Sequence, residues 1–478
     1  MSSIKKLAGQ TLWYGVPTIA SRFLGYALSL LLFWLYEPAN TASITQVYAV
    51  IPFLNILFTY GLETSYFRFA QDHEKSVVFN TLMSSILIST VAFTSFLLLN
   101  THTLAAAIDF PDHPEYIQWI AWILFFDTLS VIPFAKLRQE GRPRFYAFIK
   151  VFSIVVNVLL VLFFIGICPK LYKEDPSNAW LFFYDPTIDI GYYIIANIIA
   201  SILTLVLLTK ELMSFRFSIN WKLWRQVMQY SYPLIIVGLG GMINEMLSRL
   251  VYMRVLDLPR EEELRQLGIF GANYKLAVLI TIFIQVFRMG AEPFFFNQAK
   301  EENAPRTYAR VMKFFVIVCS FIWLAIVVNL PLIKYFGYGK NTALYEEGLS
   351  IVPILAMGSV FLGIYYNLSV WYKLTNKTLT GAWITLAGAV ITVLLNIWWI
   401  PLFGYNGSAW ATFACYAFMM IISYKLGQKH YPIPYVTKKL IAYLVIVTLL
   451  YLIHQVFIYF VSSLWIGIAF GAILLLVY

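Results

Sequence analysis

The chain has 478 residues, of which 60% are hydrophobic and only 12% charged, and its formal net charge is +10. This composition excludes a soluble globular protein, because such proteins carry about 25% charged residues. The basic residues fall in short clusters between apolar runs, as in loops that face an anionic membrane surface, so a nucleic-acid partner is not expected.

Apolar runs follow one another along the whole chain, separated by charged breaks. Because about 20 apolar residues cross a bilayer as a helix, the runs predict about fourteen transmembrane helices and an all-α membrane protein. In chain order, the predicted spans are residues 10–36, 44–67, 77–99, 116–137, 145–167, 187–209, 230–254, 267–292, 311–334, 349–372, 380–400, 405–426, 438–460 and 462–478.

Alternate loops carry most of the lysines and arginines. One such cluster runs from Lys136 to Lys150. The first cluster along the chain begins at Lys5, and the last ends at Lys439. Since basic loops are retained on the cytoplasmic side, these loops are expected to face the cytoplasm. An even number of spans then places both termini in the cytoplasm.

Charged residues inside apolar spans are the candidate functional groups, since they are costly in lipid and tend to face a cavity or a partner. In the first span, Arg22 follows Pro17, where a kink could direct the guanidinium toward a central cavity. It is either an anion ligand or one half of a structural ion pair with Asp127. In the fourth span, Asp127 is either that partner or a protonatable group for ion coupling.

Two acidic residues, Glu63 and Glu292, stand near the cytoplasmic ends of the second and eighth spans, which favours a gate or a structural role. On the seventh span, Glu245 and Arg249 are four residues apart, so they either neutralise each other on one helix face or line a cavity. In the eighth span, Lys275 lies deep and is the stronger cavity candidate, whereas Arg288 is close enough to the end to reach the headgroups.

An internal repeat relates the two halves of the chain. The pattern K-L-x2-Q-x3-Y-x2-P begins at Lys6 and again at Lys222, and F-x2-G-x-E-x3-F-x2-A begins at Phe58 and again at Phe287. Order and side of the membrane are preserved, which indicates a parallel duplication of six spans about an axis along the membrane normal. The predicted domains are therefore a six-helix lobe over residues 1–215, a second over 216–428, and an added helix pair over 429–478.

No nucleophile elbow, P-loop or metalloprotease motif is present in the sequence, and its three cysteines have no metal-site spacing, so neither catalysis nor a cofactor or metal is expected. The basic residues Arg22, Arg249, Lys275 and Arg288 outnumber Asp127 and Glu245. In an apolar cavity such cations would suit a phosphate or pyrophosphate, because their donors match phosphate oxygens. The balance favours an anionic substrate.

Several segments resemble the polysaccharide and O-antigen flippases of the multidrug/oligosaccharidyl-lipid/polysaccharide exporter superfamily. They are KKLAGQTLWYGVPTIASRFLGY at the N-terminus, GLETSYFRF from Gly61, FDTLSVIPFAKLRQEGRPRF from Phe126, and NIWWIPLFGYNGSAWAT from Asn396. The resemblance implies a V-shaped, pseudo-two-fold pair of six-helix lobes of the MATE type around a cavity that opens alternately to either side. It places the protein in the bacterial cytoplasmic (inner) membrane.

The resemblance also implies a substrate and partners. Family members carry undecaprenyl-pyrophosphate-linked oligosaccharide from the inner to the outer leaflet, while the lipid tail stays among membrane lipids. On that model Arg22 binds the pyrophosphate, Lys275 and Arg249 contribute from the second lobe, and Asp127 or a glutamate binds a coupled H⁺ or Na⁺. Polysaccharide polymerase machinery is a possible partner.

Three alternatives stay open. A multidrug or small-molecule cation antiporter would share the architecture but should have a carboxylate-rich cavity, and a peptidoglycan-precursor lipid flippase would share the fourteen spans. A membrane polysaccharide polymerase or ligase is disfavoured, because such enzymes carry a long polar extracytoplasmic loop that is absent from this sequence.

Overall fold

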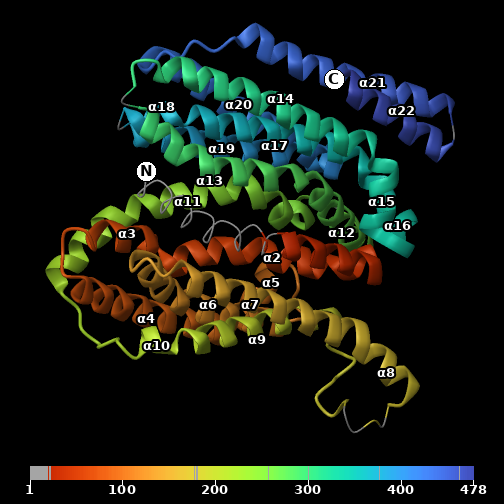
Figure 1. The fold of residues 1–478 in the computed structure, drawn as a ribbon. Helices are drawn as coiled ribbons and strands as arrows, with labels where there is room; N and C mark the ends of the chain where they lie inside the picture. Colours follow the sequence, from red (N-terminus) through yellow and green to blue (C-terminus); the bar gives the residue numbers. More distant parts are fainter. Residues whose placement is uncertain are drawn as a thin grey trace. The chain divides into compact units, whose positions relative to one another are not determined.

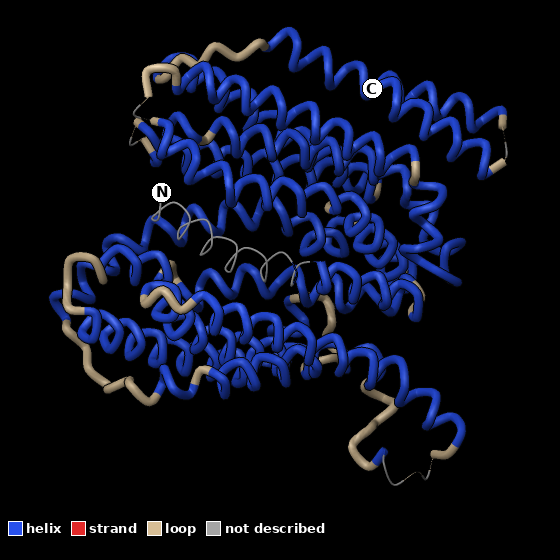
Figure 2. The backbone as a smooth tube through the Cα atoms, in the orientation of Figure 1, coloured by secondary structure: helices blue, strands red, loops and turns tan. Residues whose placement is uncertain are grey.

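The computed structural model describes residue 20 and residues 23–478, except residues 177, 179, 180, 257, 300, 376 and 462 and the side chains of 289, 290, 292, 293, 296 and 297. Every regular element in the described part of the chain is helical (Figure 2). Eleven of these helices are long and apolar enough to cross a membrane, or twelve if a bent pair counts as one span. The predicted all-α membrane protein is confirmed, while the number fourteen stays a prediction.

The bent pair comprises α12 (Arg260–Ala277) and α13 (Leu279–Gln298), which meet at an angle of 45°. Two shorter apolar helices, Phe23–Leu35 and α22 (Leu464–Val477), lie near the ends of the described chain.

The chain forms two compact units. The first contains Met1–Leu28 and Ser43–Met242, and the second contains Ser29–Ala42 and Ile243–Tyr478. The predicted lobe limits at 215 and 428 remain predictions.

The first unit is built around α6. Its α-helices, labelled in Figure 1, are α2 (Pro38–Thr59) from Ser43 onward, α3 (Leu62–Phe69), α4 (Lys75–Leu99), α5 (Thr101–Ala107), α6 (Glu115–Gln139), α7 (Pro143–Val161), α8 (Cys168–Glu174), α9 (Tyr192–Leu207), α10 (Thr209–Leu212) and the first part of α11 (Trp221–Val255). A π-helix over Leu162–Ile167 joins α7 to α8, and a 3₁₀ turn over Asp189–Gly191 precedes α9. Helix α6 contacts α3, α4, α7 and α9. The most apolar window of α6 is 67% buried, against 17% for that of Pro143–Glu174, so α6 is the more central of these two segments.

A break between α2 and α3 shapes the end of the first unit. Gly61 adopts a φ of +73°, a left-handed conformation that favours glycine. A Cβ at this position would lie 3.2 Å from Leu234, so a larger residue would also press on α11. Four residues after Gly61, Ser65 on α3 is hydrogen-bonded to Ser231 on α11 at 2.7 Å.

The second unit is built around α17. Its remaining elements are α14 (Ala304–Val328), α15 (Leu330–Tyr338), α16 (Thr342–Tyr345) between 3₁₀ turns at Gly339–Asn341 and Glu346–Ser350, α17 (Ile351–Leu368), α18 (Val370–Leu374), α19 (Thr378–Phe403), α20 (Tyr405–His430), α21 (Thr437–Phe460) and α22. Helix α17 contacts α12, α13, α14 and α20. Buried apolar side chains such as Ile269, Ile284, Val316 and Val360 fill the space between them.

The segment Ser29–Ala42 belongs to the second unit although it precedes most of the first in sequence. The Asn341 side-chain amide donates hydrogen bonds to the backbone carbonyls of Phe33 (3.1 Å) and Tyr36 (2.9 Å). The Tyr345 hydroxyl also donates to Tyr36 O at 3.0 Å. These bonds satisfy carbonyls at the end of helix Phe23–Leu35, where no further helical turn supplies donors.

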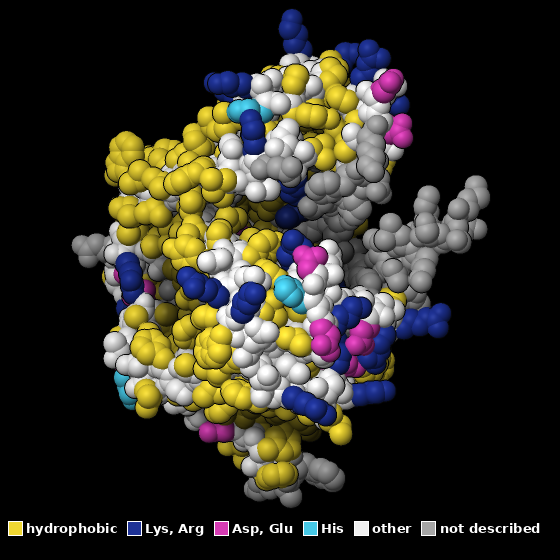
Figure 3. Space-filling model, turned by 90° about the vertical axis from the view of Figure 1, so that its left-hand side faces the viewer, with side chains coloured by type: hydrophobic (Ala, Val, Ile, Leu, Met, Phe, Trp, Pro, Cys, Tyr) yellow, Lys and Arg dark blue, Asp and Glu magenta, His cyan; other side chains and the backbone are white. Residues whose placement is uncertain are grey.

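Apolar side chains cover much of the outer surface, and they spread over the face shown in Figure 3. Only 11% of the apolar window of α21 is buried within the protein, and Leu476 on α22 is 88% exposed. Water would penalise such surfaces, whereas lipid tails accommodate them. The chain is therefore a multi-pass membrane protein.

Candidate functional site

The first unit contains a partly open polar cavity of about 410 Å³ between α2, α3, α6, α7 and α9. We call it the first-unit cavity. Three helices direct stripes of polar residues into it at helical spacing, namely Asp127 and Ser130 on α6, Tyr146, Lys150, Ser153 and Asn157 on α7, and Asn197, Ser201 and Thr204 on α9. Asn55 and Glu63 complete the lining from α2 and α3.

Asp127 lies halfway along α6 and is exposed to this cavity. Its carboxylate accepts a hydrogen bond from the Ser201 hydroxyl, and the charge of Lys150 acts on it. Nearby, the Asn197 amide donates to the Tyr48 hydroxyl at 3.1 Å. An ionisable group at mid-membrane depth is costly unless polar groups or water surround it, and this cavity supplies both the polar lining and the space.

Lys150 is the functional candidate that sequence reasoning missed, because it was grouped with the basic loop that starts at Lys136. The structure places it two turns inside α7, with Nζ 4.2 Å from the ring centroid of Phe134. The polar stripe at i, i+4, i+7 and i+11 from Tyr146 to Asn157 is the signal that could have identified it.

Glu63 lies at the edge of the same cavity, in the first turn of α3. Its Oε1 atom forms an ion pair with Nη1 of Arg138 at 2.5 Å, and both side chains are partly exposed. The Arg138 guanidinium also lies 4.9 Å from the ring centroid of Phe67. The pair thus joins the start of α3 to the end of α6.

The second unit brings together Glu245 and Arg249 of α11 with Lys275 of α12. Arg249 is only 7% exposed, and its guanidinium carbon lies 3.9 Å from the ring centroid of Tyr274. Its Nη1 donates to the Met246 sulfur at 2.8 Å, but its buried Nε has no hydrogen-bond partner among the described residues. The contacts of the described residues include no ion pair between Glu245 and Arg249, and the charges of both act on Lys275.

Arg288 lies farther along α13, exposed at the edge of a small pocket that Asn367 and Lys373 also line. Its guanidinium carbon is 4.4 Å from the ring centroid of Tyr366, and Tyr366 in turn interacts electrostatically with Tyr274. Tyr274 and Tyr366 therefore lie between Arg249 and Arg288 within the second unit. Of the other predicted residues, Arg22 and the side chain of Glu292 lie outside the described part of the chain.

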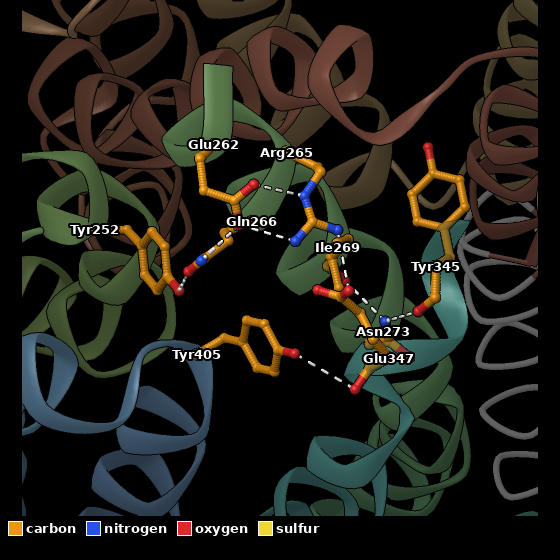
Figure 4. Close-up of polar contacts among 9 residues, drawn as sticks. All are labelled: Tyr252, Glu262, Arg265, Gln266, Ile269, Asn273, Tyr345, Glu347 and Tyr405. Atoms are coloured by element: carbon orange, nitrogen blue, oxygen red, sulfur yellow. Dashed lines mark hydrogen bonds and ion pairs between the residues drawn. The ribbon is translucent and has the colours of Figure 1, made fainter. Parts of the chain in front are cut away.

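A hydrogen-bonded network fixes α12, the helix that carries Tyr274 and Lys275 (Figure 4). Near its start, the Arg265 guanidinium binds both carboxylate oxygens of Glu262 at 2.7 and 2.8 Å and reaches Glu347 at 3.0 Å. Two turns later, the Asn273 amide donates to the backbone carbonyl of Tyr345 at 2.9 Å. The bidentate pair lies within α12 and holds the Arg265 guanidinium in place. The bonds to Glu347 and to the Tyr345 carbonyl are the ones that tie α12 to the segment around α16.

The described residues contain no group of three or more His, Cys, Asp or Glu side chains that could hold a metal ion. The arrangement instead consists of a multi-pass helical scaffold with a polar cavity in one unit and several cations, including the buried Arg249, in the other. These are features of a membrane transporter, in which intramembrane charges mark the substrate and ion pathways.

Comparison with known proteins identifies the family. The family model described as polysaccharide biosynthesis protein matches residues 7–297, which is more than half of the chain, and the protein belongs to this family. The solved structures compared below are a lipid II flippase and multidrug transporters, and the chain shares their fold. No curated protein matches its sequence.

Solved structures share the fold at low sequence identity. The lipid II flippase MurJ, in an inward closed conformation, aligns with a TM-score of 0.70 and 14% identity over 97% of each chain. An inward-facing multidrug resistance MATE family transporter aligns with a TM-score of 0.67 and 14% identity, over 86% of this chain and 94% of its own. A variant of the MATE transporter VcmN from Vibrio cholerae aligns with a TM-score of 0.61 and 13% identity, over 90% of this chain and 98% of its own. These matches confirm the predicted MATE-like fold.

Proposed function

We propose that the protein is a flippase that moves undecaprenyl-pyrophosphate-linked oligosaccharide from the inner to the outer leaflet of a bacterial inner membrane by alternating access. The observation that carries this proposal is the buried Arg249, whose Nε lacks a hydrogen-bond partner among the described residues and whose charge acts on Lys275. Membership of the polysaccharide biosynthesis family supports the same class of cargo.

The chemistry of the cationic residues fits a pyrophosphate. A buried guanidinium without a carboxylate partner is costly, and phosphate oxygens would supply the missing acceptors in a fork that matches arginine. Arg249, Lys275 and Arg288 would bind the pyrophosphate and first sugar from the second unit, and Arg22 would contribute from the first span. The aromatic rings of Tyr274 and Tyr366 offer flat surfaces beside these cations.

The transport cycle in this proposal is a population shift. Loading the anionic headgroup neutralises the cationic cluster, which favours the state with the opposite access. An ion or the membrane potential resets the cycle, and one charge moved through 100 mV supplies about 2.3 kcal/mol. Asp127 and Glu245 are the proposed ion-coupling groups, with Glu63 and Glu292 as gate residues. Both termini would lie in the cytoplasm, and polymerase machinery would receive the product.

A peptidoglycan-precursor lipid flippase is the second candidate, because its cargo carries the same polyprenyl pyrophosphate chemistry and the MurJ structure shares the fold. A multidrug cation antiporter is less favoured, since a buried Arg249 would repel an organic cation. Deleting the gene distinguishes between the two candidate lipid cargoes. Accumulation of a lipid-linked repeat unit on the inner leaflet supports the proposal, and accumulation of peptidoglycan precursor alone would replace it.

The role of Arg249 is tested in proteoliposomes that contain a fluorescent polyprenyl-pyrophosphate oligosaccharide. We expect Arg249→Gln to slow its flipping about tenfold or more, because a hydrogen bond to a charged group contributes about 1.5–3 kcal/mol. Arg225→Gln removes the same charge from the exposed start of α11 and serves as the control. Equal rates for the two variants would remove Arg249 from the substrate path.

A further inference from the structure

Lys150 in the first-unit cavity is a charged residue to which the proposed transport cycle gives no role. Its charge interacts with those of Asp127, Glu63 and Arg138. Among the contacts of the described residues, it forms no direct ion pair, and its ammonium instead lies over the ring of Phe134 at 4.2 Å. The cavity thus holds a separate positive charge beside a carboxylate at mid-membrane depth.

We propose that Lys150 is a resident cation that balances Asp127, so that the first-unit cavity exchanges protons and excludes Na⁺. This inference rests on the ion coupling in the proposed function and specifies its ion. It assigns the choice of coupling ion to one residue of α7.

Sodium is disfavoured by the charge of the site. A Na⁺ ion needs a site with net negative charge, but the single carboxylate of Asp127 is offset by Lys150, and Glu63 at the cavity edge is paired with Arg138. Two like charges 4 Å apart repel by about 4 kcal/mol at an effective dielectric constant of about 20, so an ammonium that shares the cavity weakens Na⁺ binding.

The charges in the cavity do not oppose proton exchange in this way. With the ammonium and the carboxylate both charged, the pair is neutral. Removing one proton from Lys150 leaves a net charge of −1, and adding one to Asp127 leaves a net charge of +1. Among the described residues, the titratable and charged groups that face this pair from the surrounding helices are Tyr48 on α2, Glu63 on α3, Arg138 on α6 and Tyr146 on α7, while α9 contributes Asn197 and Ser201.

The ion specificity is tested by thermal unfolding of the purified full-length chain in NaCl and in KCl at equal ionic strength. We expect the wild-type unfolding temperature to be the same in both salts. Lys150→Met should gain stabilisation by Na⁺, with at least a tenfold higher Na⁺ affinity than wild type, because it leaves Asp127 unbalanced and frees space. Lys150→Arg keeps the charge and should stay insensitive, and Lys150→Met combined with Asp127→Asn should lose the gain.

Proton exchange is tested on the same samples by following the unfolding temperature between about pH 5 and pH 9. The wild type should show a dependence on pH that the double variant reduces, since the linked groups are gone. Stabilisation of the wild type by Na⁺ over K⁺ would overturn the proposal, as would a Lys150→Met or Lys150→Gln variant that folds and ignores Na⁺. Because lipid flipping is not the readout, failure of the glycolipid assay would leave these results intact.

Discussion

Buried and exposed carboxylates in this protein contact the same cations but should contribute differently to stability. Glu211 on α10 is 3% exposed and pairs with both Arg142 (2.5 Å) and Lys136 (3.3 Å), which lie near the ends of neighbouring helices. The hydrogen bond from Arg142 to Glu211 raises the pKa of Arg142, so this guanidinium stays charged wherever the protein is folded. Glu140 contacts the same two cations from a partly exposed position, at 3.9 Å from Lys136 and 3.3 Å from Arg142.

The two glutamates give a matched pair of substitutions. We expect Glu211→Gln to destabilise the first unit by about 3 kcal/mol, because it removes the buried carboxylate and leaves only the partly exposed Glu140 to balance the two cations. Glu140→Gln should cost less than about 1 kcal/mol, as for exposed ion pairs. Thermal unfolding in detergent measures both. Similar losses for the two variants would show that burial does not decide the strength of these pairs.

Whole elements depend on close backbone approach in the second unit. A Cβ at Gly268 would lie 1.8 Å from the carbonyl oxygen of Pro38, so α12 accepts only glycine where it meets the segment Ser29–Ala42. Gly241 on α11 is also helical, yet a Cβ there would meet no atom within 4 Å. The same substitution should therefore have opposite effects at the two positions.

We expect Gly268→Ala to destabilise the protein by about 1–3 kcal/mol and to loosen the segment, because the added methyl group forces the backbones apart. Gly241→Ala should be neutral or stabilising by up to about 1 kcal/mol, since alanine favours the helix. Thermal unfolding gives the stabilities, and protease cleavage between Ser29 and Ala42 reports the loosening. A Gly268→Ala protein as stable and protease-resistant as Gly241→Ala would contradict the close contact.

Comparison of elements shows what hydropathy could and could not predict. The fourth span, predicted at 116–137, corresponds closely to α6 at Glu115–Gln139, because an apolar run with charged ends marks a buried helix clearly. The seventh, predicted at 230–254, begins nine residues earlier in the structure, at Trp221, since the amphipathic first turns of α11 do not form an apolar run. The eighth was predicted as one helix over 267–292, but it breaks at Val278, where no proline or glycine signals the bend.

Hydropathy was also only partly sufficient for the candidate site residues. Depth in an apolar run pointed to Asp127 and Arg249, which lie beside a polar cavity and an aromatic ring, and their roles stay predictions. It was not enough for Lys150, because the long lysine side chain lets a residue near a basic loop reach inward, and only packing decides its direction. Nor could it show that Glu245 and Arg249, although four residues apart, form no ion pair among the described contacts.

At the scale of the whole molecule, the asymmetry of basic loops predicts orientation in the membrane. Arg216 and Lys377 are exposed and belong to the basic set, whereas Asp112 and Phe182 are exposed in loops of the other set, with Phe182 at 89%. Alternate loops lie on opposite sides of a bilayer, and the basic ones stay in the cytoplasm. The native cysteines Cys168, Cys319 and Cys415 are all buried, so they should react slowly with an external reagent.

We therefore expect a membrane-impermeant maleimide added to intact inner-membrane spheroplasts to label Asp112→Cys and Phe182→Cys but not Arg216→Cys or Lys377→Cys. Permeabilising the cells should make all four react, which controls for accessibility. The parent protein should stay unlabelled throughout. Labelling of Arg216→Cys in intact spheroplasts would reverse the orientation, and with it the direction from which the cationic cluster around Arg249 first meets a phosphate-bearing lipid.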